Sequence, residues 1–249
     1  MTVCIVCQSC CVSVVVGVLK FFGNLSCTSY AVPMETIVRT YPLFMEVISE
    51  GVADQASQYW GVAVDTFGLL GSTQSGRSTL AVNAAQTADI VKVLGTYFSS
   101  INTGTKARSL ESASILLAYN ATPQDEELSE HWYNLLGQNV FQNVFAVVRQ
   151  PFPDLQSVGL KFMKALSVCT WGQRAIHKGA GFIEYLLDRT TGLDKTGKEL
   201  KYDIVSGLVS KKETCVETFG QAVYMKLKEY RDEGPFFVKG EHVIAFQDS

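Results

Sequence analysis

The chain has 249 residues, of which 47% are hydrophobic and 18% are charged, so it holds enough apolar sequence for a substantial core in one or two domains. Its formal net charge at pH 7 is -3, and without a basic surface we expect no nucleic-acid partner. The seven cysteines gather mainly near the N-terminus, unlike the framework of a disulfide-linked secreted protein, and favour a reducing compartment.

The first 19 residues, MTVCIVCQSCCVSVVVGVL, are mostly apolar. They contain no basic residue, which a signal peptide needs, and polar residues interrupt the apolar run that a membrane span needs. Cys4, Cys7 and Cys10 form overlapping C-x-x-C pairs, but no second Cys or His pair follows at zinc-ligand spacing. We therefore expect neither a membrane partner nor a metal, and we treat residues 1–19 as a separate N-terminal extension.

The rest of the chain contains an internal repeat. Residues 61–80 align without gaps to residues 157–176, and fainter copies lie at 16–26, 108–118 and 200–210. Each copy contains one aligned leucine, and these are Leu25, Leu70, Leu116, Leu166 and Leu208. They recur at intervals of about 45 residues, a period typical of armadillo and HEAT repeats.

The spacing of apolar residues within each copy predicts helices. Leu19, Phe22 and Leu25 are three residues apart, as are Val64, Phe67 and Leu70, which places them on one helical face. Further helices are predicted over 42–51, 86–99, 124–138 and 181–189, with one of them between each pair of repeat copies. The sequence thus predicts an all-α fold, an armadillo/HEAT-like α-solenoid of about five helical-hairpin repeats over residues 20–239.

Four residues mark where we expect helices to begin. Asp54 and Thr196 have side chains suited to an N-cap, and Pro42 and Pro153 suit a first helical turn. After Gly234 and Pro235 the chain becomes extended in pattern, and we expect residues 236–238 to cover the open core of the last repeat. Residues 240–249 are expected to form a flexible C-terminal tail.

One stretch resembles a phosphate-binding loop. Gly71, Gly76, Arg77 and Ser78 spell G-x-x-x-x-G-R-S, where the phosphate-binding motif has lysine in place of arginine. That motif needs a buried strand before it, whereas residues 61–70 follow the helical pattern of a repeat. We interpret the two glycines as the punctuation of helix ends, and we expect no nucleotide or other cofactor.

Catalytic candidates are weak. The three histidines are scattered, and Cys169 and His177 fall on either side of a repeat turn without a recognisable nucleophile motif. We therefore expect no catalytic residue.

One repeat position is charged in all five copies. Its residues are Lys20, Asp65, Glu111, Lys161 and Asp203. Because the flanking positions are apolar, this position must face water, and stacking of the copies brings the five side chains into a row. Two interpretations stay open: a solvated helix face with neighbouring opposite charges, or a surface that binds a partner.

Several stretches carry a resemblance to a known family: KFFGNL (20–25), GVAVDTFGLLGS (61–72), QPFPDLQSVGLK (150–161), GFIEYLLDR (181–189), DKTGKELKYDIVSGL (194–208) and EGPFFVK (233–239). With these, residues 20–239 resemble the C-terminal part of the proteasome non-ATPase regulatory subunit five family. The resemblance implies a solenoid without catalytic activity that acts as an assembly chaperone of the proteasome regulatory-particle base. It also implies binding to the C-terminal domain of a base ATPase subunit, which blocks premature docking onto the proteolytic core particle.

The combined expectation is a non-catalytic, cytoplasmic α-solenoid chaperone, with the nucleus as a second compartment. Two alternatives remain: a solenoid adaptor unrelated to the proteasome, and a nucleotide-binding enzyme that uses the stretch from Gly71 to Ser78.

Overall fold

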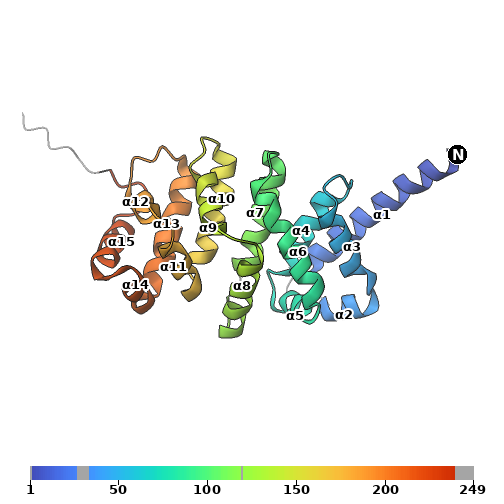
Figure 1. The fold of residues 1–249 in the computed structure, drawn as a ribbon, viewed down its shortest axis with the longest axis horizontal. Coiled ribbons are helices and arrows are strands. Elements are labelled where there is room, and N and C mark those ends of the chain that lie inside the picture. The colour runs from blue at the N-terminus through green and yellow to red at the C-terminus, as the bar shows by residue number, and fades with distance from the viewer. Residues whose placement is uncertain (1, 27–33, 119, 239–249) are drawn as a thin grey trace, which may run out of the picture.

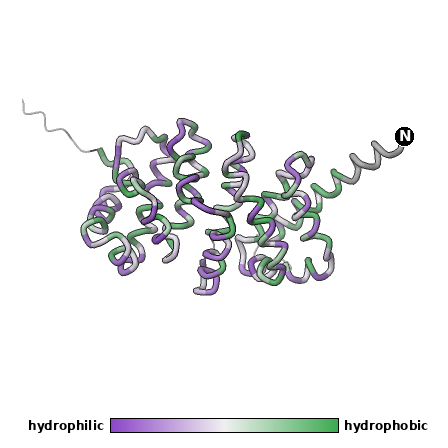
Figure 2. The backbone as a smooth tube through the Cα atoms, viewed as in Figure 1, coloured by the Kyte–Doolittle hydropathy of each residue, from purple (hydrophilic) through white to green (hydrophobic). Residues whose placement is uncertain are grey.

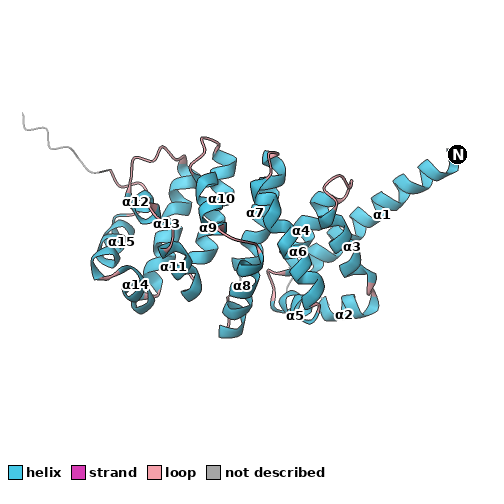
Figure 3. Cartoon of the chain, in the orientation of Figure 1, coloured by secondary structure: helices cyan, strands magenta, loops and turns pink. Residues whose placement is uncertain are grey.

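The computed structural model describes residues 2–26, 34–118 and 120–238, with side chains from Val12 onward in the first range. The helices of these ranges are α1 (Thr2–Ser26), α2 (Met34–Thr40), α3 (Leu43–Ala53), α4 (Trp60–Leu70), α5 (Gln74–Val82), α6 (Ala84–Thr96), the 3-10 turn η1 (Tyr97–Ser99), α7 (Thr103–Ala118), α8 (Pro123–Leu135), α9 (Val140–Val148), α10 (Pro153–Ser167), α11 (Thr170–His177), α12 (Phe182–Leu187), α13 (Lys195–Ser210), α14 (Lys212–Phe219) and α15 (Gln221–Glu233). Figure 3 shows helices and loops but no strand among these residues. The predicted all-α class is confirmed.

The helices form an elongated row in chain order (Figure 1). The repeat copies found in the sequence are the helices α1, α4, α7, α10 and α13, and each of them packs on the next. Within the described ranges, two α-helices lie between successive members of this stack, such as α5 and α6 between α4 and α7. The expectation of one helix per interval was therefore wrong, because the short helices α2, α5, α9 and α11 were not recognised. We call α1, α4, α7, α10 and α13 the stacked helices.

The stacked helices hold the core together. Val64, Phe67 and Leu70 of α4 are fully buried, and so are Leu110, Ala113 and Leu116 of α7. These positions recur with helical spacing, so each helix presents one apolar stripe to its neighbours. Since α4, α7 and α10 each pack between two other stacked helices, the apolar contacts run without a break from one interval to the next. Figure 2 shows hydrophobic and hydrophilic stretches mixed along the row rather than gathered at one end.

Two predicted helix starts were placed wrongly. Asp54 follows α3 as its C-cap, and its Oδ1 accepts a hydrogen bond from the backbone N–H of Ala56 at 3.0 Å in the turn that follows. Thr196 lies inside α13, whose N-cap is Asp194; the Asp194 carboxylate accepts from the N–H of Gly197 at 2.7 Å. An N-cap side chain reaches the N–H groups two or three residues ahead, and Asp194 has that position.

The two prolines lie near the helix starts where they were expected. Pro153 occupies the first turn of α10, and Pro42 immediately precedes Leu43 at the start of α3. Neither position requires a backbone N–H from the proline, so the missing donor costs nothing there.

The ends of the chain differ from the expected boundaries. Helix α1 continues through the boundary expected between residues 19 and 20. Phe236 and Val238 are largely exposed, so they do not cover the core of the last interval as expected. Tyr230 is instead buried beneath the guanidinium of Arg189, at 3.8 Å from its ring centroid. Residues 240–249 lie outside the described residues. Where the structure describes the chain, no helix has both the length and the apolarity that crossing a membrane requires.

Two glycines permit a close approach between helices in corresponding intervals. Gly76 lies in the first turn of α5 and Gly172 in the first turn of α11. A Cβ on Gly76 would overlap the backbone carbonyl of Leu70, and a Cβ on Gly172 would overlap that of Leu166. Because backbone rather than a flexible side chain stands in the way, neither site can absorb a methyl group without moving a helix.

We predict that Gly76→Ala lowers the free energy of unfolding by about 1–3 kcal/mol, because the methyl group separates α5 from the end of α4. Gly17→Ala is the matched control, since a Cβ there meets no atom within 4 Å; it should leave stability unchanged or raise it by up to about 1 kcal/mol. Urea denaturation followed by circular dichroism measures both. Equal stability of the two variants would contradict the close approach.

Candidate partner-binding surface

The five repeat-related charged residues lie one on each stacked helix, and none is buried. Lys20 is on α1, Asp65 on α4, Glu111 on α7, Lys161 on α10 and Asp203 on α13. Their neighbours on either side along each helix include buried core residues, so the backbone holds this position toward solvent. The expected exposure of this position is therefore confirmed.

Ion pairs involve four of these residues, those on α4, α7, α10 and α13, and each pair joins two neighbouring stacked helices. Glu111 and Lys161 pair directly, with the Lys161 Nζ 2.7 Å from Oε1 of Glu111. Asp65 pairs instead with Arg108 of α7 at 3.3 Å, and Asp203 pairs with Lys164 of α10 at 2.8 Å. We call these six residues the ion-pair row: Asp65, Arg108, Glu111, Lys161, Lys164 and Asp203.

Sequence reasoning missed two members of the row. Arg108 lies three residues before Glu111, and Lys164 lies three residues after Lys161. Residues three apart in a helix are neighbours on its surface, so the helical spacing carried the signal. Arg108 and Lys164 do not occupy the repeat position that is charged in all five copies, so the repeat pattern alone does not point to them.

The charges of the row remain accessible. Their side chains are between 41% and 53% exposed, so each pair adds at most about 1 kcal/mol to stability. Partial burial raises the pKa of Asp65 and the nearby Glu111 adds to the rise, although Arg108 and Lys20 act against it. A hollow of about 380 Å³ lies beside this point, lined by Asp65, Arg108 and Glu111 among others. The row thus offers charges of both signs that a partner can reach.

The stretch that resembles a phosphate loop is part of the helical core. It follows the helix α4 rather than a strand, and Gly71 is the C-cap of that helix. Thr73 then caps α5, with its hydroxyl accepting a hydrogen bond from the N–H of Gly76 at 3.3 Å. The interpretation of Gly71 as a helix end is confirmed, whereas Gly76 lies inside the first turn of α5 and not at a helix end.

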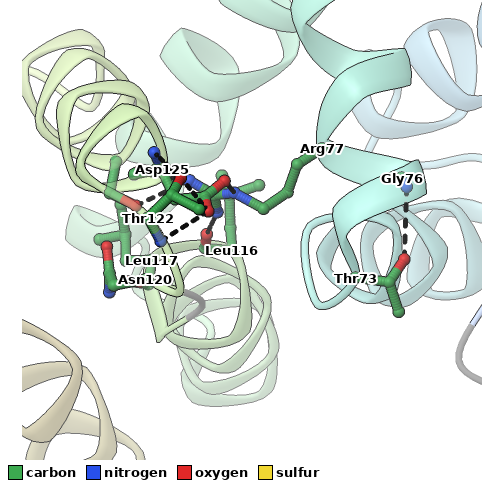
Figure 4. A network of polar contacts seen from close by, with 9 residues as sticks. Thr73, Gly76, Arg77, Leu116, Leu117, Asn120, Thr122 and Asp125 are labelled. Atoms are coloured by element: carbon green, nitrogen blue, oxygen red, sulfur yellow. Dashed lines mark hydrogen bonds and ion pairs between the residues drawn. The ribbon is translucent and has the colours of Figure 1, made fainter.

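The arginine of this stretch is buried and joins three helices (Figure 4). Arg77 is 1% exposed. It donates to the Leu116 carbonyl at the end of α7 at 2.9 Å, to the Asp125 carbonyl at 2.8 Å and to the Ser129 hydroxyl of α8 at 2.9 Å. Its Nε also lies 3.3 Å from an Asp125 carboxylate oxygen, and its guanidinium stacks 4.6 Å over Trp132. The guanidinium is therefore engaged within the fold and is not presented to a phosphate.

Asp125 is held in place from its other side. It belongs to a capping box in which Thr122 accepts from the Asp125 N–H at 3.2 Å, while the Asp125 carboxylate accepts from the Thr122 N–H at 3.0 Å. The same carboxylate therefore begins α8 and binds Arg77, which fixes α8 relative to α5.

The corresponding interval uses a glutamine in the same way. Gln173 occupies the position of Arg77 in the aligned copy, and its side-chain amide donates to the carbonyl groups of Ser167 at 3.1 Å and Leu208 at 3.2 Å. Leu208 and Leu116 are equivalent leucines of the repeat. A long polar side chain thus ties the short helix to the end of the next stacked helix in both intervals.

The other sequence candidates do not come together. Cys169 precedes α11 and His177 ends it, so they are about 12 Å apart along the helix axis. Burial raises the pKa of Cys169 to about 12, and the nearby Glu126 adds to the rise, which keeps the thiol protonated. The side chains of Cys4, Cys7 and Cys10 lie outside the described residues. Elsewhere in the described part, no group of three His, Cys, Asp or Glu side chains is placed to bind a metal.

We predict that Arg77→Met lowers the free energy of unfolding by about 3–5 kcal/mol, because it leaves the buried Asp125 carboxylate without its cation. Arg108→Met, which breaks an exposed pair, is the control and should cost less than about 1 kcal/mol. Guanidinium chloride would screen both pairs, so urea denaturation is the appropriate measurement. A loss below 1 kcal/mol for Arg77→Met would show that the buried network does not support the fold.

Comparison with known proteins identifies the family of the chain. The sequence model of the family described as Proteasome non-ATPase 26S subunit matches residues 12–248, a range that includes parts of both the expected extension and the expected tail. The 26S proteasome non-ATPase regulatory subunit 5 of Homo sapiens is 33% identical over 234 residues, which cover 93% of this chain and 46% of that protein. The proteins of the same name from Bos taurus and Drosophila melanogaster are 33% identical over 225 residues and 25% identical over 233 residues, covering 90% and 92% of this chain and 44% of each relative.

The chain thus spans less than half the length of these relatives and corresponds to their C-terminal part. The match to the family extends over nearly all of the sequence. The chain belongs to the Proteasome non-ATPase 26S subunit family.

Proposed function

We propose that this chain is a non-catalytic chaperone for assembly of the base of the proteasome regulatory particle. Family membership is the observation that carries the proposal, since the relatives are named as a non-ATPase regulatory subunit of the 26S proteasome. The partner we propose is the C-terminal domain of a base ATPase subunit. Because the matched part is less than half of each relative, both the function and the partner are proposals for this chain.

We further propose that the fold is an armadillo-type solenoid of about five repeats. Each interval supplies one stacked helix and two others, as in α5, α6 and α7. Armadillo and HEAT repeats are built from three or two helices over a similar period. The count of three helices therefore favours the armadillo arrangement over the helical hairpin.

The ion-pair row is our candidate for part of the partner-binding surface. Its residues lie on α4, α7, α10 and α13, and each of these helices packs directly on the next. The shared core therefore holds the charges at fixed spacing. Charges that are already positioned lose little freedom on binding and favour one orientation of the partner. A domain bound along this row would have part of its surface covered, which in the proposed function delays its contact with the core particle.

Nothing in this role requires a cofactor or a nucleotide. The guanidinium that suggested a nucleotide site is engaged with Asp125 and its neighbours, and we propose no enzymatic activity. The proposed location is the cytoplasm, with the nucleus as a second compartment, as for proteasome assembly.

The purified chain should recover a base ATPase subunit from a lysate, and should bind the isolated C-terminal domain of that subunit in calorimetry. A chain that retains its helical circular dichroism but recovers no ATPase would contradict the proposal. Recovery of an unrelated protein in its place would favour a solenoid adaptor outside the proteasome.

A charge exchange tests the row itself. In the double variant Glu111→Lys with Lys161→Glu the ion pair is kept and its direction reversed, so we expect unchanged stability. We expect affinity for the ATPase domain to fall at least about 10-fold, since the charge pattern that meets the partner is inverted. The control is the same exchange at Asp89 and Lys92 of α6, an exposed pair outside the row, which should leave affinity unchanged.

Calorimetry measures the affinity of each variant for the ATPase domain. If both exchanged variants bind as tightly as the native chain, the ion-pair row is a solvated helix face and not a binding surface.

A further inference from the structure

The outer side of α1 is open at positions that are buried on every later stacked helix. Phe21 of α1 is 62% exposed, whereas its repeat equivalents Thr66, Ser112, Phe162 and Ile204 are each at most 2% exposed. Val18 shows the same contrast, being 42% exposed while the equivalent Ala63 of α4 is fully buried. The difference is therefore a property of the place of α1 in the row and not of the residue type.

Three of the buried equivalents of Phe21 contact residues that precede their own helix. The Thr66 hydroxyl donates to a backbone carbonyl of α1 at 3.3 Å, and the Ser112 hydroxyl donates to a backbone carbonyl of α4 at 2.8 Å. Phe162 packs edge-on against Phe98 of η1, which lies before α7, with 5.9 Å between ring centroids. The contact between Phe162 and Phe98 shows that a phenylalanine fits at this repeat position when helices earlier in the chain cover it.

The open side continues as an apolar groove. It has a volume of about 350 Å³ and lies between α1 and α3. Val14, Val18 and Phe22 line it from α1, and Leu43 and Val47 line it from α3. No charged side chain lines this groove, so it differs from the other hollows on the described surface. In Figure 1 α1 stands at the end of the row, and no described helix lies beyond it.

We propose that this face binds one further helical repeat, whose long helix packs on α1 as α1 packs on α4. The geometry of the existing contacts defines the chemistry of that helix. Where α1 meets α4, a Cβ on Gly23 would lie 3.3 Å from the Thr66 side chain. Where α4 meets α7, the equivalent Gly68 lies against Ser112. The occupant therefore carries a small residue opposite Phe21, with apolar residues on the flanking turns.

The relatives indicate where such a repeat comes from. They are more than twice as long as the matched region, which lies in their C-terminal part, so each of them has sequence that precedes the equivalent of α1. The occupant we propose is a helical repeat of that preceding segment. This inference does not depend on ATPase binding, and the two can fail separately.

The test mixes the full chain with the segment that precedes the matched region in the human relative, and measures mass by size-exclusion chromatography with light scattering. We expect a one-to-one complex for the native chain and for Ile101→Glu, which changes a fully exposed apolar residue in the loop before α7. Phe21→Glu should weaken the complex at least about 30-fold, since a carboxylate is placed in an apolar contact. Circular dichroism of each protein alone verifies that it is folded.

Two outcomes would overturn the proposal. One is a native chain that stays separate from a folded segment. The other is a native chain that dimerises by itself through this face, with the dimer abolished by Phe21→Glu, which would make a second copy the occupant.

If the segment does not fold alone, it is joined covalently before residue 12. The joined protein should then melt at a higher temperature than the chain, and Phe21→Glu should remove that gain; an unchanged melting temperature would equally overturn the proposal.

Discussion

The structure depends on one constraint: each stacked helix has an apolar stripe too wide to be covered by a single neighbour. Phe67 and Leu70 of α4 are fully buried, and α1, α3 and α7 all pack against that helix. A unit that cannot bury its own surface must be followed by another, which produces a row instead of a closed bundle. The length of the row, and the long surface along it, follow from that requirement.

The same constraint separates the roles of the polar residues. Polar groups that fall between packed helices are stabilised by hydrogen bonds, as Arg77 is by the carbonyl groups of Leu116 in α7 and Asp125 in the first turn of α8. Other charged residues of the stacked helices face solvent, as do Glu111 and Lys161, which pair across two helices. The first kind fixes how one interval sits on the next. The second kind is free to be recognised by another protein, and this is the basis of the function we propose.

Much of the fold was predictable from the sequence because the stacked helices repeat a strong pattern. The leucines at 25, 70, 116, 166 and 208 located all five of them. The short helices α2, α5, α9 and α11 were missed, since a helix of seven to nine residues shows few turns of periodicity and its stability comes from tertiary contacts. Asp54 was misread as an N-cap because the same short polar side chain also suits the turn after a helix.

The candidate site was also predictable only in part. A water-facing charged position could be predicted from its apolar neighbours, which is how Asp65 and Lys161 were found. Their partners were only partly predictable, since Asp65 pairs with Arg108, a residue outside the repeat position, rather than with Lys20. The buried ion pair of Arg77 with Asp125 joins residues far apart in the chain, and a single sequence contains no signal for such a contact.

Hydrogen exchange of the chain, free and bound to the C-terminal domain of a base ATPase subunit, tests the account most directly. If the stacked helices present the partner-binding surface, binding should slow exchange in α4, α7, α10 and α13, and leave α5, α8 and α11 unchanged. Protection confined to α5, α8 and α11 would show that the partner binds the opposite side of the row, and would contradict the assignment of function to the ion-pair row.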